Sequence, residues 1–148
     1  MSDEHRFSLT ATWDATAREG KLATADGSLA CSHAGAPSLG GKGGMANPEE
    51  LLIGAVSACF VQTWAIFIGK LQLPIENPVV DASCVVDKDP AGGFRVTEME
   101  LAPNVPAALW ESRKAEVEKT LALAEKYCIV SKAVRTEGMA FRVIPKAV

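Results

Sequence analysis

A long apolar run over residues 51–69 constrains the fold more than any other feature of this chain. It follows a strong helix-start signal in residues 47–50, where an asparagine suited to the N-cap precedes a proline and two glutamates. The glutamates also complement the positive end of the helix dipole. The segment therefore predicts a single apolar helix that runs to about Lys70 and ends before Pro74.

The same run is nominally long enough to cross a lipid bilayer. Three polar side chains stand in its central part, Ser57, Gln62 and Thr63, and no cluster of Lys or Arg marks a cytoplasmic flank. We therefore interpret the run as a helix buried on most of its sides and expect no membrane partner. Because a chain of 148 residues has little material to cover so apolar a helix, we expect a homodimer that buries it between subunits.

Strand-like patterns flank this helix on both sides. The expected strands are residues 7–13, a hairpin of 21–25 and 28–32, an antiparallel pair of 79–88 and 94–101, and a closing strand at 139–144. A second, amphipathic helix is expected over residues 107–127, and a short helical turn after Cys128. This order fits one α+β domain covering residues 1–148.

Charge and composition exclude some classes of partner. The net charge is −3 and the basic residues are scattered, so we expect no nucleic-acid partner. The first six residues are polar and no apolar signal-peptide core follows them, which predicts a cytoplasmic protein whose thiols are kept reduced. In that compartment, four cysteines are more typical of catalytic, metal-binding or core positions than of a disulfide scaffold.

The cysteines by themselves leave their roles open. Cys59 lies within the apolar run, where a free cysteine usually behaves as a small hydrophobe, and burial raises its pKa unless a cation stabilises the thiolate. Cys128 has Lys126 nearby, which would lower its pKa. Cys31 and Cys84 lie in expected strands and are interpreted as structural. A metal site needs three or four ligands, and with only two histidines in the chain none is expected.

A glycine-rich loop at residues 35–44 looks at first like a phosphate-binding loop. Ala36 stands where the first glycine is needed, and Gly43 stands where a serine or threonine should bind magnesium. The phosphate-loop interpretation therefore fails. A flexible loop over a site and a plain surface connection both stay open.

Three segments carry a resemblance to a known family. They are residues 47–51 with residues 57–60, directly after the glycine-rich loop; residues 128–131 at the end of the second helix; and residues 16–20 with 25–27. In their order and spacing they resemble the OsmC/Ohr family of organic hydroperoxide reductases over nearly the whole chain. The resemblance implies an OsmC-like fold, with antiparallel sheets wrapped around two long helices, in an intertwined homodimer with two active sites at the subunit interface.

The resemblance also implies a role for each matching residue. Cys59 is the expected peroxidatic thiolate and Cys128 the expected resolving thiol. Arg18 is expected to pair with the thiolate and to polarise the peroxide, and Glu49 to orient Arg18 through a salt bridge. The partners implied are an organic hydroperoxide as substrate and an external dithiol as reductant, which in many Ohr-type members is a lipoylated protein. No bound cofactor and no metal are implied.

Elementary chemistry agrees with these roles. An arginine supplies a permanent charge to a buried thiolate, and a carboxylate limits the cost of burying that charge. Attack on the peroxide leaves a sulfenic acid, which condenses with the second thiol to a disulfide. The apolar side chains of Phe60, Trp64 and Phe67 are the expected walls of the substrate pocket, which would favour fatty or aromatic hydroperoxides over hydrogen peroxide.

Two features complicate the assignment. Glu49 and Cys59 are ten positions apart, or ~15 Å along a straight helix at ~1.5 Å per residue, so both reach Arg18 only if the helix is interrupted, for example at Gly54, or if a second subunit contributes. The better-studied branches of the family usually have proline directly after the second cysteine, whereas this chain has Ile129. That departure leaves open an alternative function, a non-enzymatic protein that binds a hydrophobic ligand or senses redox state on the same scaffold.

Overall fold

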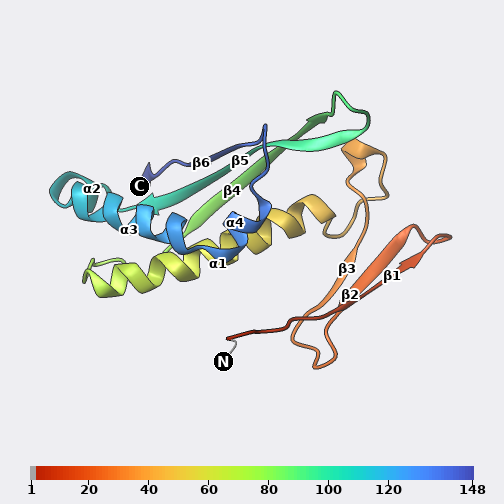
Figure 1. The fold of residues 1–148 in the computed structure, drawn as a ribbon, viewed down its shortest axis with the longest axis horizontal. Helices are drawn as coiled ribbons and strands as arrows, with labels where there is room; N and C mark the ends of the chain where they lie inside the picture. Colours follow the sequence, from red (N-terminus) through yellow and green to blue (C-terminus); the bar gives the residue numbers. More distant parts are fainter. Residues whose placement is uncertain (1–2) are drawn as a thin grey trace. The chain divides into compact units, whose positions relative to one another are not determined.

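The computed structural model describes residues 3–148, which group into two compact units that meet in sequence at Leu51 and Leu52. The first unit holds β1 (Thr10–Asp14), β2 (Glu19–Ala23), β3 (Ala30–His33), the short 3-10 helix η1 (Pro37–Leu39) and the start of α1 (Pro48–Lys70). The second unit holds the rest of α1, β4 (Val80–Lys88), β5 (Phe94–Val105), α2 (Ala107–Ser112), α3 (Lys114–Tyr127), α4 (Ile129–Val134), β6 (Ala140–Val143) and β7 (Lys146–Ala147) (Figure 1). This content confirms the predicted α+β class. A single domain over residues 1–148 stays a prediction.

The first unit is an antiparallel sheet in the order β1-β2-β3, which confirms the predicted hairpin. Gly20 lies between Trp13 and His33 in neighbouring strands, and without a side chain there the two rings stack with centroids 6.1 Å apart. A Cβ on Gly20 would lie 2.3 Å from the Thr12 carbonyl oxygen, so only glycine fits this position.

Little apolar side chain is buried in the first unit. The core cluster of the described residues is drawn entirely from the second unit, and in the first unit only Ala34 counts as a buried apolar residue. Phe7, Leu9 and Trp13 are all exposed, Trp13 to 57%. A three-stranded sheet without a buried face has little to stabilise it alone.

The structure confirms the predicted helix from residue 48 to Lys70, which is α1. Its start is a capping box: the amide of Glu50 donates to the Asn47 side-chain oxygen at 2.8 Å, and the amide of Asn47 donates to the Glu50 carboxylate at 3.3 Å. The suggested interruption at Gly54 is wrong, because α1 is continuous through it. A lone glycine weakens a helix without breaking it when the flanking residues hold their hydrogen bonds.

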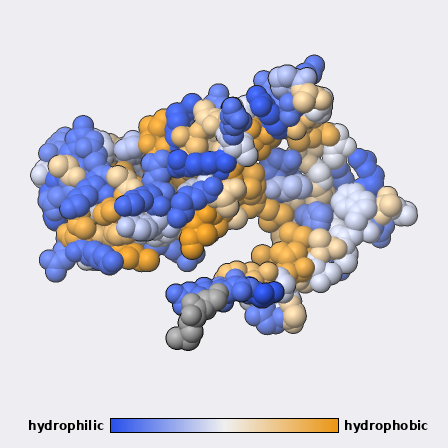
Figure 2. Space-filling model, viewed as in Figure 1, coloured by the Kyte–Doolittle hydropathy of each residue, from blue (hydrophilic) through white to orange (hydrophobic). Residues whose placement is uncertain are grey.

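One stripe of α1 is buried: Val56, Phe60, Trp64 and Ile68 recur every four residues. Burying each contributes ~1.5–3 kcal/mol relative to exposure. By length and hydropathy alone α1 could also cross a membrane, a test that core helices of soluble proteins pass as well. Only 22% of its most apolar stretch is buried in the single chain. Figure 2 shows hydrophobic residues, in orange, at the surface of the chain.

The second sheet has the order β4-β5-β6, with β7 also paired to β5. The β4–β5 hairpin is antiparallel as predicted, with a register shift between Val85 and Val86. However, β6 and β7 run parallel to β5, so this sheet is mixed and the expectation of purely antiparallel sheets is wrong for it. The helices between β5 and β6 return the chain to the same end of the sheet, which permits the parallel pairing.

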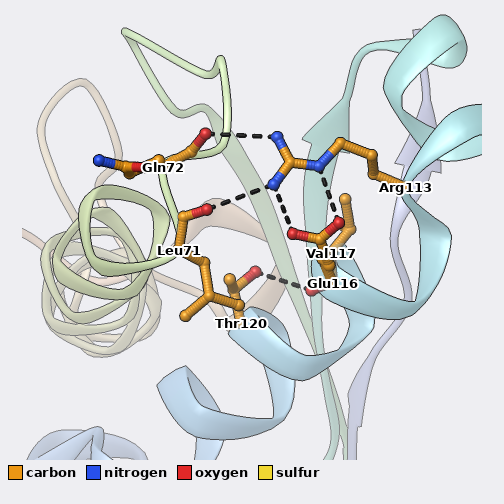
Figure 3. A network of polar contacts seen from close by, with 6 residues as sticks. All are labelled: Leu71, Gln72, Arg113, Glu116, Val117 and Thr120. Atoms are coloured by element: carbon orange, nitrogen blue, oxygen red, sulfur yellow. Dashed lines mark hydrogen bonds and ion pairs between the residues drawn. The ribbon is translucent and has the colours of Figure 1, made fainter.

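The predicted second helix is divided in two. Arg113 has φ −135° and ψ 34°, which ends α2 and begins α3. Its guanidinium donates to the carbonyl oxygens of Leu71 and Gln72, each at 3.3 Å, and pairs with Glu116 (Figure 3). Arg113 therefore satisfies carbonyl groups just beyond the end of α1 from the position at which α2 and α3 divide.

A buried polar contact joins α1 to α3 within the core. The indole N–H of Trp64 donates to the Thr120 hydroxyl at 3.0 Å. That hydroxyl donates in turn to the Val117 carbonyl at 2.7 Å, a bond drawn in Figure 3. Trp64 and Thr120 are both fully buried. Together with the Arg113 contacts, this bond fixes α3 antiparallel to α1, so the end of α3 lies beside the middle of α1.

Candidate active site

The second unit brings two of its cysteines into contact. Cys59 lies in the middle of α1, and Cys128 occupies the single position between α3 and α4. The two sulfur atoms are within hydrogen-bonding range of each other. The predicted meeting of these two thiols, which are far apart in sequence, is therefore present in the fold.

The sulfur of Cys59 is stabilised as a thiolate. Burial raises its pKa, but hydrogen bonds from the Val130 amide, the Cys128 thiol, the Ile129 amide and the Thr63 hydroxyl outweigh that effect. The net result is a pKa below the ordinary value of 9.0. These donors all come from the second unit, so the lowering of the Cys59 pKa does not depend on Arg18.

The sulfur of Cys128 is driven in the opposite direction. Burial raises its pKa, the Ser131 hydroxyl and amide oppose this, and hydrogen bonding to Cys59 raises it further. Its net pKa lies above the ordinary value of 9.0, and the residue is fully buried. The contact therefore joins Cys59, whose pKa is lowered, to Cys128, whose pKa is raised. The Cys128 thiol is protonated at neutral pH and donates a hydrogen bond to the Cys59 sulfur.

Local structure around Cys128 explains where these donors point. Cys128 is the N-cap of α4, with φ −68° and ψ 106°. The amides that follow it therefore point toward the N-terminal end of α4 and have no acceptor within that helix. The buried Ser131 hydroxyl donates to the Cys128 carbonyl at 3.1 Å and holds this turn. The Thr63 hydroxyl, one turn after Cys59, lies 2.8 Å from the Cys59 carbonyl oxygen, so its one hydrogen is shared between that oxygen and the sulfur.

Sequence reasoning missed Thr63, Val130 and Ser131. Cysteine is not a favoured N-cap residue, so no capping signal in the sequence marked the helix start that supplies the amide donors. Thr63 could have been found from its spacing of four residues after Cys59 in a helix.

Arg18 lies in the first unit, on the turn between β1 and β2. The Asp14 side chain accepts hydrogen bonds from the amides of Thr16 and Ala17, each at 2.9 Å, and this turn leaves Arg18 with φ +58°. The Arg18 guanidinium donates to the Gly40 carbonyl at 2.7 Å. The turn and the glycine-rich loop are therefore joined through Arg18.

Glu49 lies in the first turn of α1. One of its carboxylate oxygens is buried and has no hydrogen-bond partner within the described chain. Among the ion pairs of residues 3–148, none joins Glu49 to Arg18. The predicted Arg18–Glu49 salt bridge stays a prediction, and Glu49 carries a buried acceptor that lacks a hydrogen-bond donor.

The three predicted wall residues differ in position. Phe60 and Trp64 are fully buried in the core, so their side chains present no surface to a ligand in this chain. Both follow the buried stripe of α1, which sequence alone could not separate from a pocket wall. Phe67 is partly exposed and stacks on Tyr127 with ring centroids 5.7 Å apart.

A model of the family described as OsmC-like protein matches residues 41–143, which include both cysteines. This chain belongs to the OsmC-like family. It is 32% identical over 139 residues to the organic hydroperoxide resistance protein of Xanthomonas axonopodis pv. citri, covering 91% of this chain and 93% of that one.

Solved structures support this membership. The organic hydroperoxide resistance protein from Elizabethkingia anophelis superposes on this OsmC-like chain with a TM-score of 0.76 at 25% identity, covering 98% of this chain and 99% of that one. The OsmC-like protein from Mycoplasma pneumoniae gives a TM-score of 0.80 at 13% identity, with 99% of each chain covered, which supports the fold alone.

Proposed function

We propose that this OsmC-like protein is a thiol-dependent peroxidase that reduces organic hydroperoxides, of the alkyl or fatty acid kind, to alcohols. The observation that carries the proposal is the contact between Cys59 and Cys128, in which one sulfur has a lowered pKa and the other a raised pKa. This asymmetry supplies one nucleophile and one proton donor. The name of the Xanthomonas relative supports an organic hydroperoxide as substrate.

The reaction proceeds in three steps. The Cys59 thiolate attacks the distal peroxide oxygen, the O–O bond breaks, and the alkoxide takes a proton to leave as alcohol while Cys59 becomes a sulfenic acid. The Cys128 sulfur then attacks Cys59, which forms the disulfide and releases water. An external dithiol reduces the disulfide to two thiols and is itself oxidised to a disulfide.

Arg18 and Glu49 complete the site in this proposal. Arg18 polarises the bound peroxide and adds charge stabilisation to the thiolate, and Glu49 orients it. The buried oxygen of Glu49 without a partner supports this role, because such an oxygen needs a hydrogen-bond donor and a guanidinium can supply one. Since α1 is continuous between Glu49 and Cys59, a helix break does not shorten the distance between them.

A homodimer follows from the same reasoning. The first unit buries almost no apolar side chain, and most of the apolar stretch of α1 is uncovered in one chain. A second copy supplies the missing cover and, as in an intertwined dimer, residues for each site. We also propose a cytoplasmic location, where a protein dithiol such as a lipoylated protein can serve as reductant.

The test is oxidation of the reduced protein with one equivalent of cumene hydroperoxide, followed by mass spectrometry of the intact chain and its peptides. The expected product lacks two hydrogens and contains a Cys59–Cys128 disulfide. Cys59→Ser should abolish peroxide consumption, whereas Cys128→Ser should trap a sulfenic acid that a dimedone probe labels.

Cys84→Ser serves as the matched control and should form the same disulfide as the unmodified protein. A protein that retains four free thiols after peroxide treatment would contradict the proposal. In that case a hydrophobic-ligand-binding role on the same scaffold becomes the better explanation.

A further inference from the structure

Two aromatic rings and two lysines from α1 and α3 form an exposed rim. We call Phe67, Tyr127, Lys70 and Lys126 the cationic rim. The rings of Phe67 and Tyr127 stack, with an interplanar angle of 30°. The Lys70 ammonium lies 5.5 Å from the centroid of the Phe67 ring, and the Lys126 ammonium lies 5.2 Å from that of Tyr127. Tyr127 is 51% exposed in the single chain, so its ring is open to a ligand there.

The cationic rim lies on the same side of the helices as the sulfur atoms. Lys70 follows Cys59 by eleven positions, close to three full helical turns, so both lie on the same face of α1, with Thr63 between them. Along the axis the two Cα atoms are ~16 Å apart, and helical side chains lean toward the helix N-terminus, which brings the ammonium of Lys70 closer to Cys59. Tyr127 directly precedes Cys128.

Neither lysine of the rim is neutralised. Among the ion pairs of residues 3–148, none includes Lys70 or Lys126, and the neighbouring Glu125 pairs with Arg135. Lys114 offers a contrast within the same helix, because it also lies over an aromatic ring, that of Trp110, but approaches Glu118 at 3.9 Å. The rim therefore has two unpaired positive charges beside an apolar, flat surface.

We propose that Lys70 and Lys126 are specificity-determining residues that bind the carboxylate of an acyl-chain hydroperoxide. The chain lies against the rings of Phe67 and Tyr127, its carboxylate faces the two ammonium groups, and its peroxide group reaches Cys59. An apolar chain with an anionic end can contact both the rings and the ammonium groups of the rim. A neutral hydroperoxide can contact only the rings. This inference rests on the proposed peroxidase function.

The experiment compares three substrates with a dithiol in excess: linoleic acid hydroperoxide, its methyl ester, and cumene hydroperoxide. We expect the unmodified protein to have a higher kcat/KM for the free acid than for the ester. In the Lys70→Gln, Lys126→Gln double variant, the ratio of kcat/KM for the free acid to that for the ester should fall roughly threefold to tenfold. This is the effect expected for two partly exposed charges. The ratio should also fall as sodium chloride is added to the unmodified protein.

Lys114→Gln is the matched control, because it removes a lysine with the same ring contact at the other end of α3, and it should leave the ratio unchanged. The inference is overturned if the acid-to-ester ratio of kcat/KM is unchanged in the double variant, or if it falls equally in Lys114→Gln. In either case, turnover of cumene hydroperoxide still supports the proposed function. If the double variant keeps the acid-to-ester ratio but its disulfide is reduced more slowly by a protein dithiol, the lysines bind the reductant protein rather than the substrate. That result also overturns the inference. Turnover of none of the three substrates overturns both proposals.

Discussion

The sulfur of Cys59 is partly buried, and burial by itself disfavours the thiolate. The fold compensates with donors from one short segment, the amides of Ile129 and Val130 and the thiol of Cys128. Ile129 also stands where the resemblance to the better-studied branches of the family predicts a proline. A proline has no amide hydrogen, so this departure supplies Cys59 with a donor that proline lacks.

Substitution Ile129→Pro should therefore raise the pKa of Cys59. Proline fits the first position of α4, and Cys128 already has the extended conformation that precedes proline, so the fold should tolerate it. A higher pKa means less thiolate at neutral pH, so alkylation of Cys59 by iodoacetamide at pH 7 should slow and its pH profile should move to higher pH.

Ile129→Ala is the control for this change, because it removes the side chain and keeps the amide hydrogen. It should leave the alkylation profile close to that of the unmodified protein. Equal profiles for the proline and alanine variants would contradict the role of the Ile129 amide.

Elements depend on one another most clearly where α1 meets α3. The buried stripe of α1 supplies the apolar contact with α3. The hydrogen bond between Trp64 and Thr120 sets the position of α3 along the axis of α1. Arg113 fixes the other end of the same pair (Figure 3). The position of Cys128 beside Cys59 is thus a consequence of the antiparallel packing of two helices.

Substitution Thr120→Val should destabilise the protein by about 1–3 kcal/mol, because it leaves the buried indole N–H of Trp64 without an acceptor at nearly constant volume. Urea unfolding followed by circular dichroism measures the change. Thr120→Ser keeps the hydroxyl and is the control, which should lose less stability. A smaller loss in the valine variant than in the serine variant would show that packing, rather than the hydrogen bond, governs this contact.

At the scale of the whole molecule, the described chain leaves much apolar surface uncovered. Ile66 on α1 is 57% exposed, and the sheet of the first unit has no core of its own. An isolated chain of this kind is expected to associate, because large exposed apolar surfaces are characteristic of interfaces.

Substitution Ile66→Lys distinguishes a dimer from a monomer. In a monomer it replaces an exposed residue and should change stability by no more than ~0.5 kcal/mol. In the proposed dimer it places a charge in an apolar interface, so light scattering after size-exclusion chromatography should show loss of the dimer. Val148→Lys, at an equally exposed position near the C-terminus, should remain dimeric. An unmodified protein that elutes as a monomer would refute the dimer.

Much of the fold follows from local sequence. The capping residues before α1, its apolar run and the alternation in β4 and β5 specify these elements, and the structure confirms them. The break at Arg113 was not predictable, because the residues around it continue a helical pattern and the carbonyl groups that bind it belong to α1. The parallel pairing of β6 to β5 likewise depends on where the intervening helices return the chain.

The sequence by itself determined the apolar helix and the family to which the chain is similar, and through that resemblance it predicts roles for Cys59 and Cys128. Only the tertiary structure decided the directions in which the two thiol pKa values move, because burial and the amides of Ile129 and Val130 act on Cys59 after α3 has packed against α1. It also placed Phe60 and Trp64 in the core and left Phe67 at the surface. Periodicity identifies an apolar residue, but whether its side chain meets a protein neighbour or open solvent is set by contacts that are distant in sequence.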